Sequence, residues 1–444
     1  MQDRISLLES LIARARRLGA EQADAVVFDS VSSSVSFRLG QLEEVERSES
    51  VDLGLRVFIG RQQAAVASND MTPAALDQLA ARAVAMARTT PEDPYCGLAP
   101  AELLAKSFPN LDLEDRHEPS SERLVELARS CEGAALAVKG ITNSEGASAG
   151  WGRGAVALVT SGGFAGSYAT TNISVSVSVI AGEGTGMERD YDFSSARHGG
   201  DLGDPSEVGR TAANLALKRL NARRVKSQSV PVVFDPRVSN SLLGHLAGAI
   251  NGVSIARGTS FLKDKMGQRV FANGIRIVDD PHIVRGVRSK PFDGEGVANR
   301  PMNLVEDGVL KTWILDSASA RQLKLTSTGH AARGTGGPPS PSTSNLYLVP
   351  GTLSPAALMA DIAQGFYVTE LIGMGVNGVT GDYSRGASGF WIENGQIAYP
   401  VNEVTIAGNL NAMFAAMTPA NDLVFRYGTN APTLRVEGMT IAGD

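Results

Sequence analysis

The first half of the chain shows two hydrophobic spacings in turn. Apolar residues three and four positions apart predict four amphipathic helices. Between these helices, apolar and polar residues alternate, which predicts half-buried antiparallel strands. The predicted helices cover residues 5–18, 73–88, 121–138 and 205–220. The predicted strands include residues 25–28, 35–39, 51–59 and 173–179.

These elements follow one order, helix then strands then helix, and the order occurs twice. Ser121 is expected to cap the first helix of the second copy. The two copies are similar in the order of their elements but less similar in sequence. An internal duplication is therefore one interpretation of this half. We therefore expect residues 1–225 to form an α+β domain in which helices pack on an antiparallel sheet.

A helix with unusual glycines is predicted after a strand at residues 230–234. Asp235 and Pro236 are typical of a helix start, and the stretch extends towards residue 267. Each internal glycine costs about 1 kcal/mol relative to alanine, so we expect another backbone or a ligand to approach closely. His245 has no second potential metal ligand within one helical turn, which favours a histidine of the core or of a wall. The helix should bury residues 238, 242, 246, 249, 250 and 253 and carries glycines at 244, 248 and 252.

From residue 270 onward the chain reads as short strands separated by Gly, Asn and Asp turns. Glu306-Asp307-Gly308 and Glu393-Asn394-Gly395 are typical of tight hairpins. Residues 333–344 contain three glycines, three prolines and three serines, which predicts a mobile surface loop. We therefore expect residues 226–444 to form a β-rich domain with one buried helix. Its predicted strands are 274–280, 304–315, 345–349, 366–372, 390–398, 403–407 and 433–436.

Composition narrows the class of protein. The 444 residues are 43% hydrophobic and 20% charged, which is ordinary for a globular protein, and no apolar run has the length of a membrane span. The two cysteines cannot form a disulfide framework, and the first residues do not resemble a signal peptide, so a cytoplasmic location is expected. A net charge of −6 makes nucleic acid an unexpected partner.

Several short motifs lack the structural context that their chemistry needs. Gly373 to Gly378 matches GxGxxG, but the glycine-rich sequence after it cannot open a helix. Gly146 to Gly150 matches GxSxG, but a strand is predicted after it where a nucleophile elbow needs a helix. The five histidines and two cysteines provide no closely spaced metal pair. None of these motifs therefore predicts an active site.

The glycine-rich segment from Gly373 to Gly389 has two open interpretations. It carries Asn377, Asp382 and Arg385 and offers exposed backbone groups, which suits holding an extended peptide by strand addition. It could equally form a tight turn between two strands. The sequence alone does not decide between them.

Several longer motifs resemble one family. They are Arg257 to Ser260 (RGTS), Ser327 to His330 (STGH), Asn377 to Ser384 (NGVTGDYS), Gly389 to Gly395 (GFWIENG) and Thr405 to Leu410 (TIAGNL). The chain resembles the TldD/PmbA family, and within it the PmbA (TldE) branch. The resemblance implies a cytoplasmic zinc metallopeptidase in which a TldD-type chain pairs with a PmbA-type chain to degrade or mature peptides.

One departure from the family pattern changes this expectation. In the TldD branch the first helix of the C-terminal domain carries HExxxH, and a later cysteine completes the zinc site. With the RGTS motif as anchor, the ligand and base positions of that motif are Leu243, Gly244 and Gly248 here, and no cysteine follows Cys131. The resemblance therefore implies no catalytic residue and no metal in this chain, with zinc expected in a TldD-type partner.

The resulting hypothesis is a non-catalytic subunit that shapes a peptide channel. Its expected partners are a TldD-type homologous subunit and an unfolded or extended peptide, without a membrane, and self-association stays open. Two alternatives are a stand-alone peptidase of the family and a regulatory binding protein of the DNA gyrase modulator type. The candidate substrate-binding residues are His245, His330, Asn377, Asp382, Arg385 and Ser388.

Overall fold

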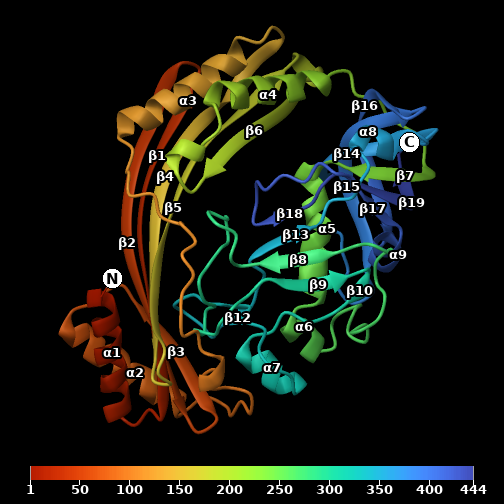
Figure 1. Cartoon of the computed structure of the whole chain (residues 1–444). Helices are drawn as coiled ribbons and strands as arrows, with labels where there is room; N and C mark the ends of the chain where they lie inside the picture. The colour runs from red at the N-terminus through yellow and green to blue at the C-terminus, as the bar shows by residue number, and fades with distance from the viewer. Residues whose placement is uncertain (1, 444) are drawn as a thin grey trace.

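The N-terminal half forms one long antiparallel sheet that carries helices (Figure 1). The computed structural model describes residues 2–443. The strand order is β3-β2-β1-β4-β5-β6, so the two copies of helix, three strands and helix meet where β1 pairs with β4. The elements are α1 Gln2–Arg17, β1 Gln22–Arg38, β2 Gln41–Ile59, β3 Gln62–Ser68, α2 Pro73–Ala87, η1 Ala101–Leu103, α3 Ser121–Leu136, β4 Ile141–Thr160, β5 Ala165–Ala181, η2 Gly184–Gly186, β6 Glu188–Ala196, η3 Gly199–Asp201 and α4 Pro205–Lys218.

Both helix pairs cover the same face of this sheet, one pair at each end. Ala25 and Val27 of β1 pack with α1 and α2, whereas Val35 and Phe37 pack with α3 and α4. All four residues are odd-numbered, and side chains two apart in a strand point to the same side. The expected α+β fold is confirmed. One detail differs, because α3 is capped by the side chain of Ser120 and begins at Ser121.

The strands of the sheet are longer than the sequence pattern predicts. The predicted strands 25–28 and 35–39 belong to one strand, β1, which ends at Arg38 and pairs with β2 on one side and with β4 on the other. The intervening serines carry no hydrophobic alternation and so gave no strand signal. They remain extended because both neighbouring strands satisfy their backbone groups.

The C-terminal half contains two further sheets with the orders β10-β9-β8-β13-β18 and β16-β15-β14-β7-β19-β17. In the second sheet β16 also pairs with β19, so the sheet closes on itself. The elements are β7 Gln228–Phe234, α5 Pro236–Ala249, α6 Gly252–Ala256, β8 Ile277–Asp280, β9 Met302–Glu306, β10 Val309–Leu310, α7 Ser317–Leu323, β11 Ala331–Ala332, β12 Ser340–Pro341, β13 Asn345–Leu348, α8 Pro355–Met359, β14 Gln364–Ile372, β15 Asp382–Glu393, β16 Gln396–Asn409, α9 Leu410–Ala415, β17 Met417–Pro419, β18 Thr429–Asn430 and β19 Leu434–Ala442.

Both predicted hairpins are present. They join β9 to β10 and β15 to β16. The central pairs Asp307-Gly308 and Asn394-Gly395 have positive φ at both positions, as a two-residue turn between twisted strands requires. No described helix is both long and apolar enough to cross a membrane.

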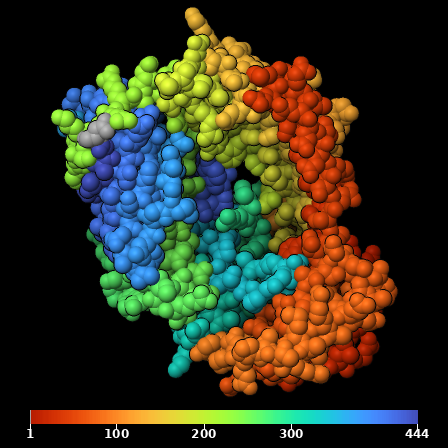
Figure 2. All heavy atoms as spheres, turned by 180° about the vertical axis from the view of Figure 1, so that it is seen from behind, coloured from red at the N-terminus to blue at the C-terminus, as the bar shows by residue number. Residues whose placement is uncertain are grey.

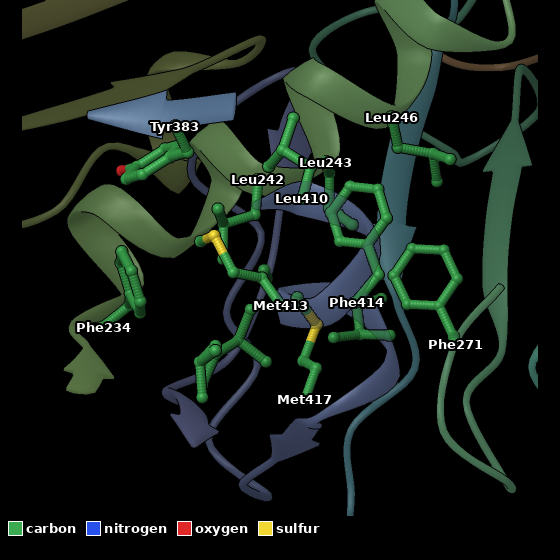
Figure 3. Close-up of a cluster of buried hydrophobic side chains, with 14 of the residues drawn as sticks. Phe234, Leu242, Leu243, Leu246, Phe271, Tyr383, Leu410, Met413, Phe414 and Met417 are labelled. Atoms are coloured by element: carbon green, nitrogen blue, oxygen red, sulfur yellow. The ribbon is translucent and has the colours of Figure 1, made fainter. Parts of the chain in front are cut away.

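Helix α5 lies in the core of the C-terminal half. Leu242, Leu243 and Leu246 are fully buried in a cluster with the aromatic rings of Phe271 and Phe414 (Figure 3). The single helix predicted from Asp235 towards residue 267 is wrong in extent. Asn251 caps a new helix, α6, through its side chain, and the backbone N–H of Gly252 donates to Ile314.

The segment 333–344, predicted as a mobile surface loop, has exposed residues at Gly334, Gly336, Pro338 and Ser340 but is anchored at both ends. The side chain of Arg333 is only 3% exposed and forms an ion pair with Asp24 of β1. At the other end of the segment, Ser344 donates through its backbone N–H and its hydroxyl to the buried carboxylate of Asp279. The composition is that of a loop, but its polar groups have buried partners far away in the sequence.

The C-terminal half contacts both ends of the long sheet. At the end near α1, the carboxylate of Asp24 lies between Arg56 and Arg333, with N–O distances of 2.5 Å to each, and all three side chains are buried. At the end near α4, Arg237 reaches Asp190 of β6 at 2.7 Å. Further ion pairs at this second junction are Arg219–Glu370 and Arg426–Asp192.

A polar face of the sheet lies between these two junctions. Val26 and Phe28 of β1 pack with Phe292 of the C-terminal half. Further along the same side of β1 lie Ser30, Ser32 and Ser34, which are exposed beside the glycines and threonines of β4 and β5. Figure 2 shows a hollow between the sheet and the C-terminal half.

Asp24→Asn should lower the free energy of unfolding by about 3–5 kcal/mol, because two buried guanidinium groups lose their counter-charge. Urea unfolding followed by circular dichroism measures this loss. Glu126→Gln is the matched control, since Glu126 pairs with Arg123 on the surface of α3 and both side chains are more than half exposed. Equal losses in the two variants would contradict a structural role for the Asp24 cluster.

Glu295→Gln should make stability less dependent on pH. Burial, together with the nearby Asp293 carboxylate, raises the pKa of Glu295 from 4.5 to about 7. The folded chain therefore binds more protons than the unfolded chain between these values, and this group makes folding less favourable as pH rises from 4.5 to 7. The variant should remove a loss on the order of 3 kcal/mol. Urea midpoints at pH 5 and pH 7.5 test this, and an unchanged slope would refute it.

Candidate functional site

A cavity of about 490 Å³ lies along the side of α5 that faces away from the core. Its walls come from α5, from the chain that follows α6, from the turn between β14 and β15, and from β15 itself. This arrangement brings together segments that are more than 100 residues apart in the sequence. The lining residues are Ser241, Gly244, His245, Gly248, Ala249, Ser254, Thr259, Phe261, Met374, Val376, Gly378, Arg385 and Leu410.

The glycines of α5 create space for the cavity. A Cβ atom built at Gly244 or Gly248 would meet no atom within 4 Å, so no backbone approaches them. The expected close approach of another backbone is therefore wrong at these two positions, which border the cavity instead. At Gly252, by contrast, two side chains approach closely, since a Cβ would lie 2.6 Å from atoms of Leu315 and Ser319. Larger side chains at 244 or 248 would extend into the cavity.

His245 is half-buried in the cavity wall and has an unused polar atom. Its Nε2 is buried without a hydrogen-bond partner. The ring lies edge-on to that of Tyr383, with 5.9 Å between ring centroids. Burial lowers the pKa of His245, and the positive charge of Arg385 lowers it further. The imidazole is therefore neutral at pH 7 and can donate or accept one hydrogen bond at Nε2.

Arg385 brings a positive charge to the same cavity. It lies in β15, whose backbone pairs with both β14 and β16. Its Nε is buried without a hydrogen-bond partner. None of the lining residues is acidic. The cavity therefore has a positive charge with no counter-charge of its own.

The residues at this site do not fit a catalytic zinc ion. Such an ion needs three protein ligands and an open position. The cavity lining contains one imidazole and neither a carboxylate nor a thiolate. Leu243 points into the core and is fully buried, while Gly244 and Gly248 have no donor atoms. In the described part of the chain, no three potential metal ligands group together.

Asn377 and Asp382 hold the turn between β14 and β15. The side-chain oxygen of Asn377 accepts from the backbone N–H groups of Val379 and Thr380. The Asp382 carboxylate accepts from the hydroxyl of Thr380 and from the Asn409 amide, and these hydrogen bonds lower its pKa. Residues 373–381 thus form the turn, and the GxGxxG motif lies within it.

The strand-addition interpretation of this segment is wrong. Residues 386–393 of β15 pair with both β14 and β16. Residues 382–385 pair with β16, and on the other side Tyr383 and Ser384 contact Val376 and Gly375 of the turn, so the strand has no free edge for a peptide. Ser388 is buried within this strand and is only 8% exposed. The GxSxG motif from Gly146 to Gly150 likewise lies inside a strand, β4.

His330 lies apart from the cavity among internal partners. It is 3% exposed, with Nε2 3.2 Å from the Asp279 carboxylate and Nδ1 2.8 Å from the Thr328 hydroxyl. Of the six residues expected to bind substrate, the structure brings only His245 and Arg385 together at the cavity.

Sequence reasoning missed the apolar wall of the cavity. Phe261, Met374, Val376 and Leu410 come from three separate segments. Met374 is 90% exposed, and its position between two glycines was the one local signal that an apolar side chain is held outside the core.

Successive parts of the chain match the three domain models of one protein family. Residues 227–443 match the PmbA/TldA metallopeptidase C-terminal domain, residues 114–220 match the central domain, and residues 23–87 match domain 1. Metalloprotease PmbA of Escherichia coli O157:H7 is 39% identical over 98% of this chain and 96% of its own length. A Metalloprotease PmbA homolog of Haemophilus influenzae is 37% identical over 97% and 94%.

Solved structures share the fold over the full length. A protein of Bacteroides thetaiotaomicron described as a modulator of DNA gyrase superposes with a TM-score of 0.92 and 25% identity, covering 100% of both chains. TldE of Thermococcus kodakarensis superposes with a TM-score of 0.88 and 20% identity, covering 98% of this chain and 100% of its own. From the identity to the PmbA sequences over almost its whole length, the chain belongs to the PmbA/TldD metallopeptidase family.

Proposed function

We propose that this chain is the non-catalytic, PmbA/TldE-like subunit of a heteromeric TldD/PmbA-type peptidase that degrades or matures peptides. The carrying observation is the lining of the cavity beside α5. It contains a single imidazole and no carboxylate or thiolate where a zinc peptidase needs three ligands and a general base. Zinc then belongs to the TldD-type partner.

The chemistry of peptide hydrolysis supports this division of roles. Hydrolysis at neutral pH needs a water molecule whose pKa has been lowered, usually by a bound metal ion. His245 alone cannot hold such an ion, and no acidic residue lines the cavity to act as a base. This chain would instead bind and orient the peptide, with His245 and Arg385 as its contacts.

Two further features support a subunit that handles peptides in the cytoplasm. The hollow beside the long sheet is lined mainly by serines, glycines and threonines, which offer hydrogen bonds, together with Arg153 and Arg197. Both cysteines are free, which suits a reducing compartment. The proposed partner class is represented among the relatives, because a Metalloprotease TldD homolog of Buchnera aphidicola is 26% identical over 53% of this chain.

The alternatives have less support. A stand-alone peptidase would need activating groups that the cavity does not contain. Direct binding to DNA, which a gyrase modulator could require, is disfavoured by the net charge of −6.

The purified chain should hydrolyse no peptide and should bind less than one zinc ion per chain, whereas adding a TldD-type homologue should produce zinc-dependent cleavage. The reason is that the ligands are absent from the cavity of this chain. Elemental analysis and a fluorogenic peptide assay, with and without a chelator, test this. Cleavage by the lone chain that resists the chelator, or one tightly held zinc per chain, would contradict the proposal.

A further inference from the structure

The cavity beside α5 combines an unneutralised positive group with apolar walls. We propose that it binds the C-terminal carboxylate of a peptide whose last side chain is apolar. The inference rests on the proposed function for the source of the ligand, a peptide, whereas the site itself is argued from its own residues. The proposal assigns a ligand class to the cavity beside α5, whose lining has no carboxylate or thiolate.

Arg385 is the group that would hold the carboxylate. Its buried Nε has no hydrogen-bond partner, and no acidic residue lines the cavity. A buried charged donor without a partner is costly, and such groups normally pair. The planar guanidinium matches a carboxylate through two parallel hydrogen bonds, so an α-carboxylate is a fitting partner.

His245 would add one directed hydrogen bond. Its ring lines the same cavity, and its Nε2 is buried without a partner. Because no Asp or Glu lines the cavity, no internal anion competes with an incoming carboxylate. The site therefore has two free polar groups, one of them charged, and both can donate to an anion.

The rest of the cavity selects what is attached to the carboxylate. Phe261, Met374, Val376 and Leu410 form an apolar wall that suits a hydrophobic side chain. The absence of an acidic lining residue disfavours a free amino acid, because its α-ammonium group would have no counter-charge. In a peptide this nitrogen is a neutral amide. A doubly charged phosphate would find only one cation and few donors here.

The test measures binding by isothermal titration calorimetry on the full chain without a partner. Acetyl-Ala-Ala-Phe with a free carboxylate should bind, and the same peptide as a C-terminal amide should bind at least about 10-fold more weakly, because a charge-assisted pair is lost. Free phenylalanine should also bind at least about 10-fold more weakly. Equal binding of acid and amide, or equal binding of free phenylalanine, would overturn the assignment.

Variants separate the site from general effects of charge and folding. Arg385→Met should weaken binding of the acid by about 10-fold to 100-fold, and Arg385→Lys should weaken it less. Arg61→Met is the matched control. Arg61 is exposed in the turn between β2 and β3, and its substitution changes the net charge by the same amount. Gly248→Leu fills the cavity while Arg385 is retained, and it should abolish binding while α5 stays folded. Undiminished binding by folded Arg385→Met or Gly248→Leu would refute the site.

The outcome is independent of whether the heteromer forms, because the titration uses this chain alone. Carboxylate binding without stimulation of a TldD-type partner would refute the proposed function and support the site. Stimulation of the partner by a chain that binds acid and amide equally would support the function and refute the site.

Discussion

The buried Asp24 carboxylate, held between Arg56 and Arg333, joins the two halves of the molecule at one end of the long sheet. A second set of ion pairs, including Arg237–Asp190, joins them at the other end. Strand β1 has 17 residues, which corresponds to roughly 55 Å of extended chain. The two junctions lie near opposite ends of this length. The C-terminal half therefore bridges the sheet, and a hollow remains between them (Figure 2).

The same rigid framework forms the cavity. One side of α5 buries Leu242 and Leu246 in the core, while Gly244 and Gly248 leave the opposite side open. Arg385 is carried by an inner strand of a sheet that closes on itself. Because both walls are anchored by regular hydrogen bonding, the spacing between the backbones that carry His245 and Arg385 is set before any ligand arrives, which lowers the cost of ordering on binding.

Membership in a metallopeptidase family and the chemistry of the site are separate matters here. The backbone of the family is retained over the full length, with a TM-score of 0.92 to the Bacteroides protein. The donor atoms that peptide hydrolysis needs are side-chain atoms, and the cavity lining has a single imidazole among them. A fold can therefore persist while its site takes on another role, since function resides in the side chains that the fold carries.

The sequence by itself determined the features that depend on local chemistry. Helix starts followed from caps such as Asp235 with Pro236, and hairpins followed from Asp307-Gly308, because these residues act on their own backbone. Only the tertiary structure decided that β1 continues through its serines, that Arg333 is buried, and that Arg385 faces His245 across 140 residues of chain. Those outcomes depend on partners far away in the sequence, which no local pattern encodes.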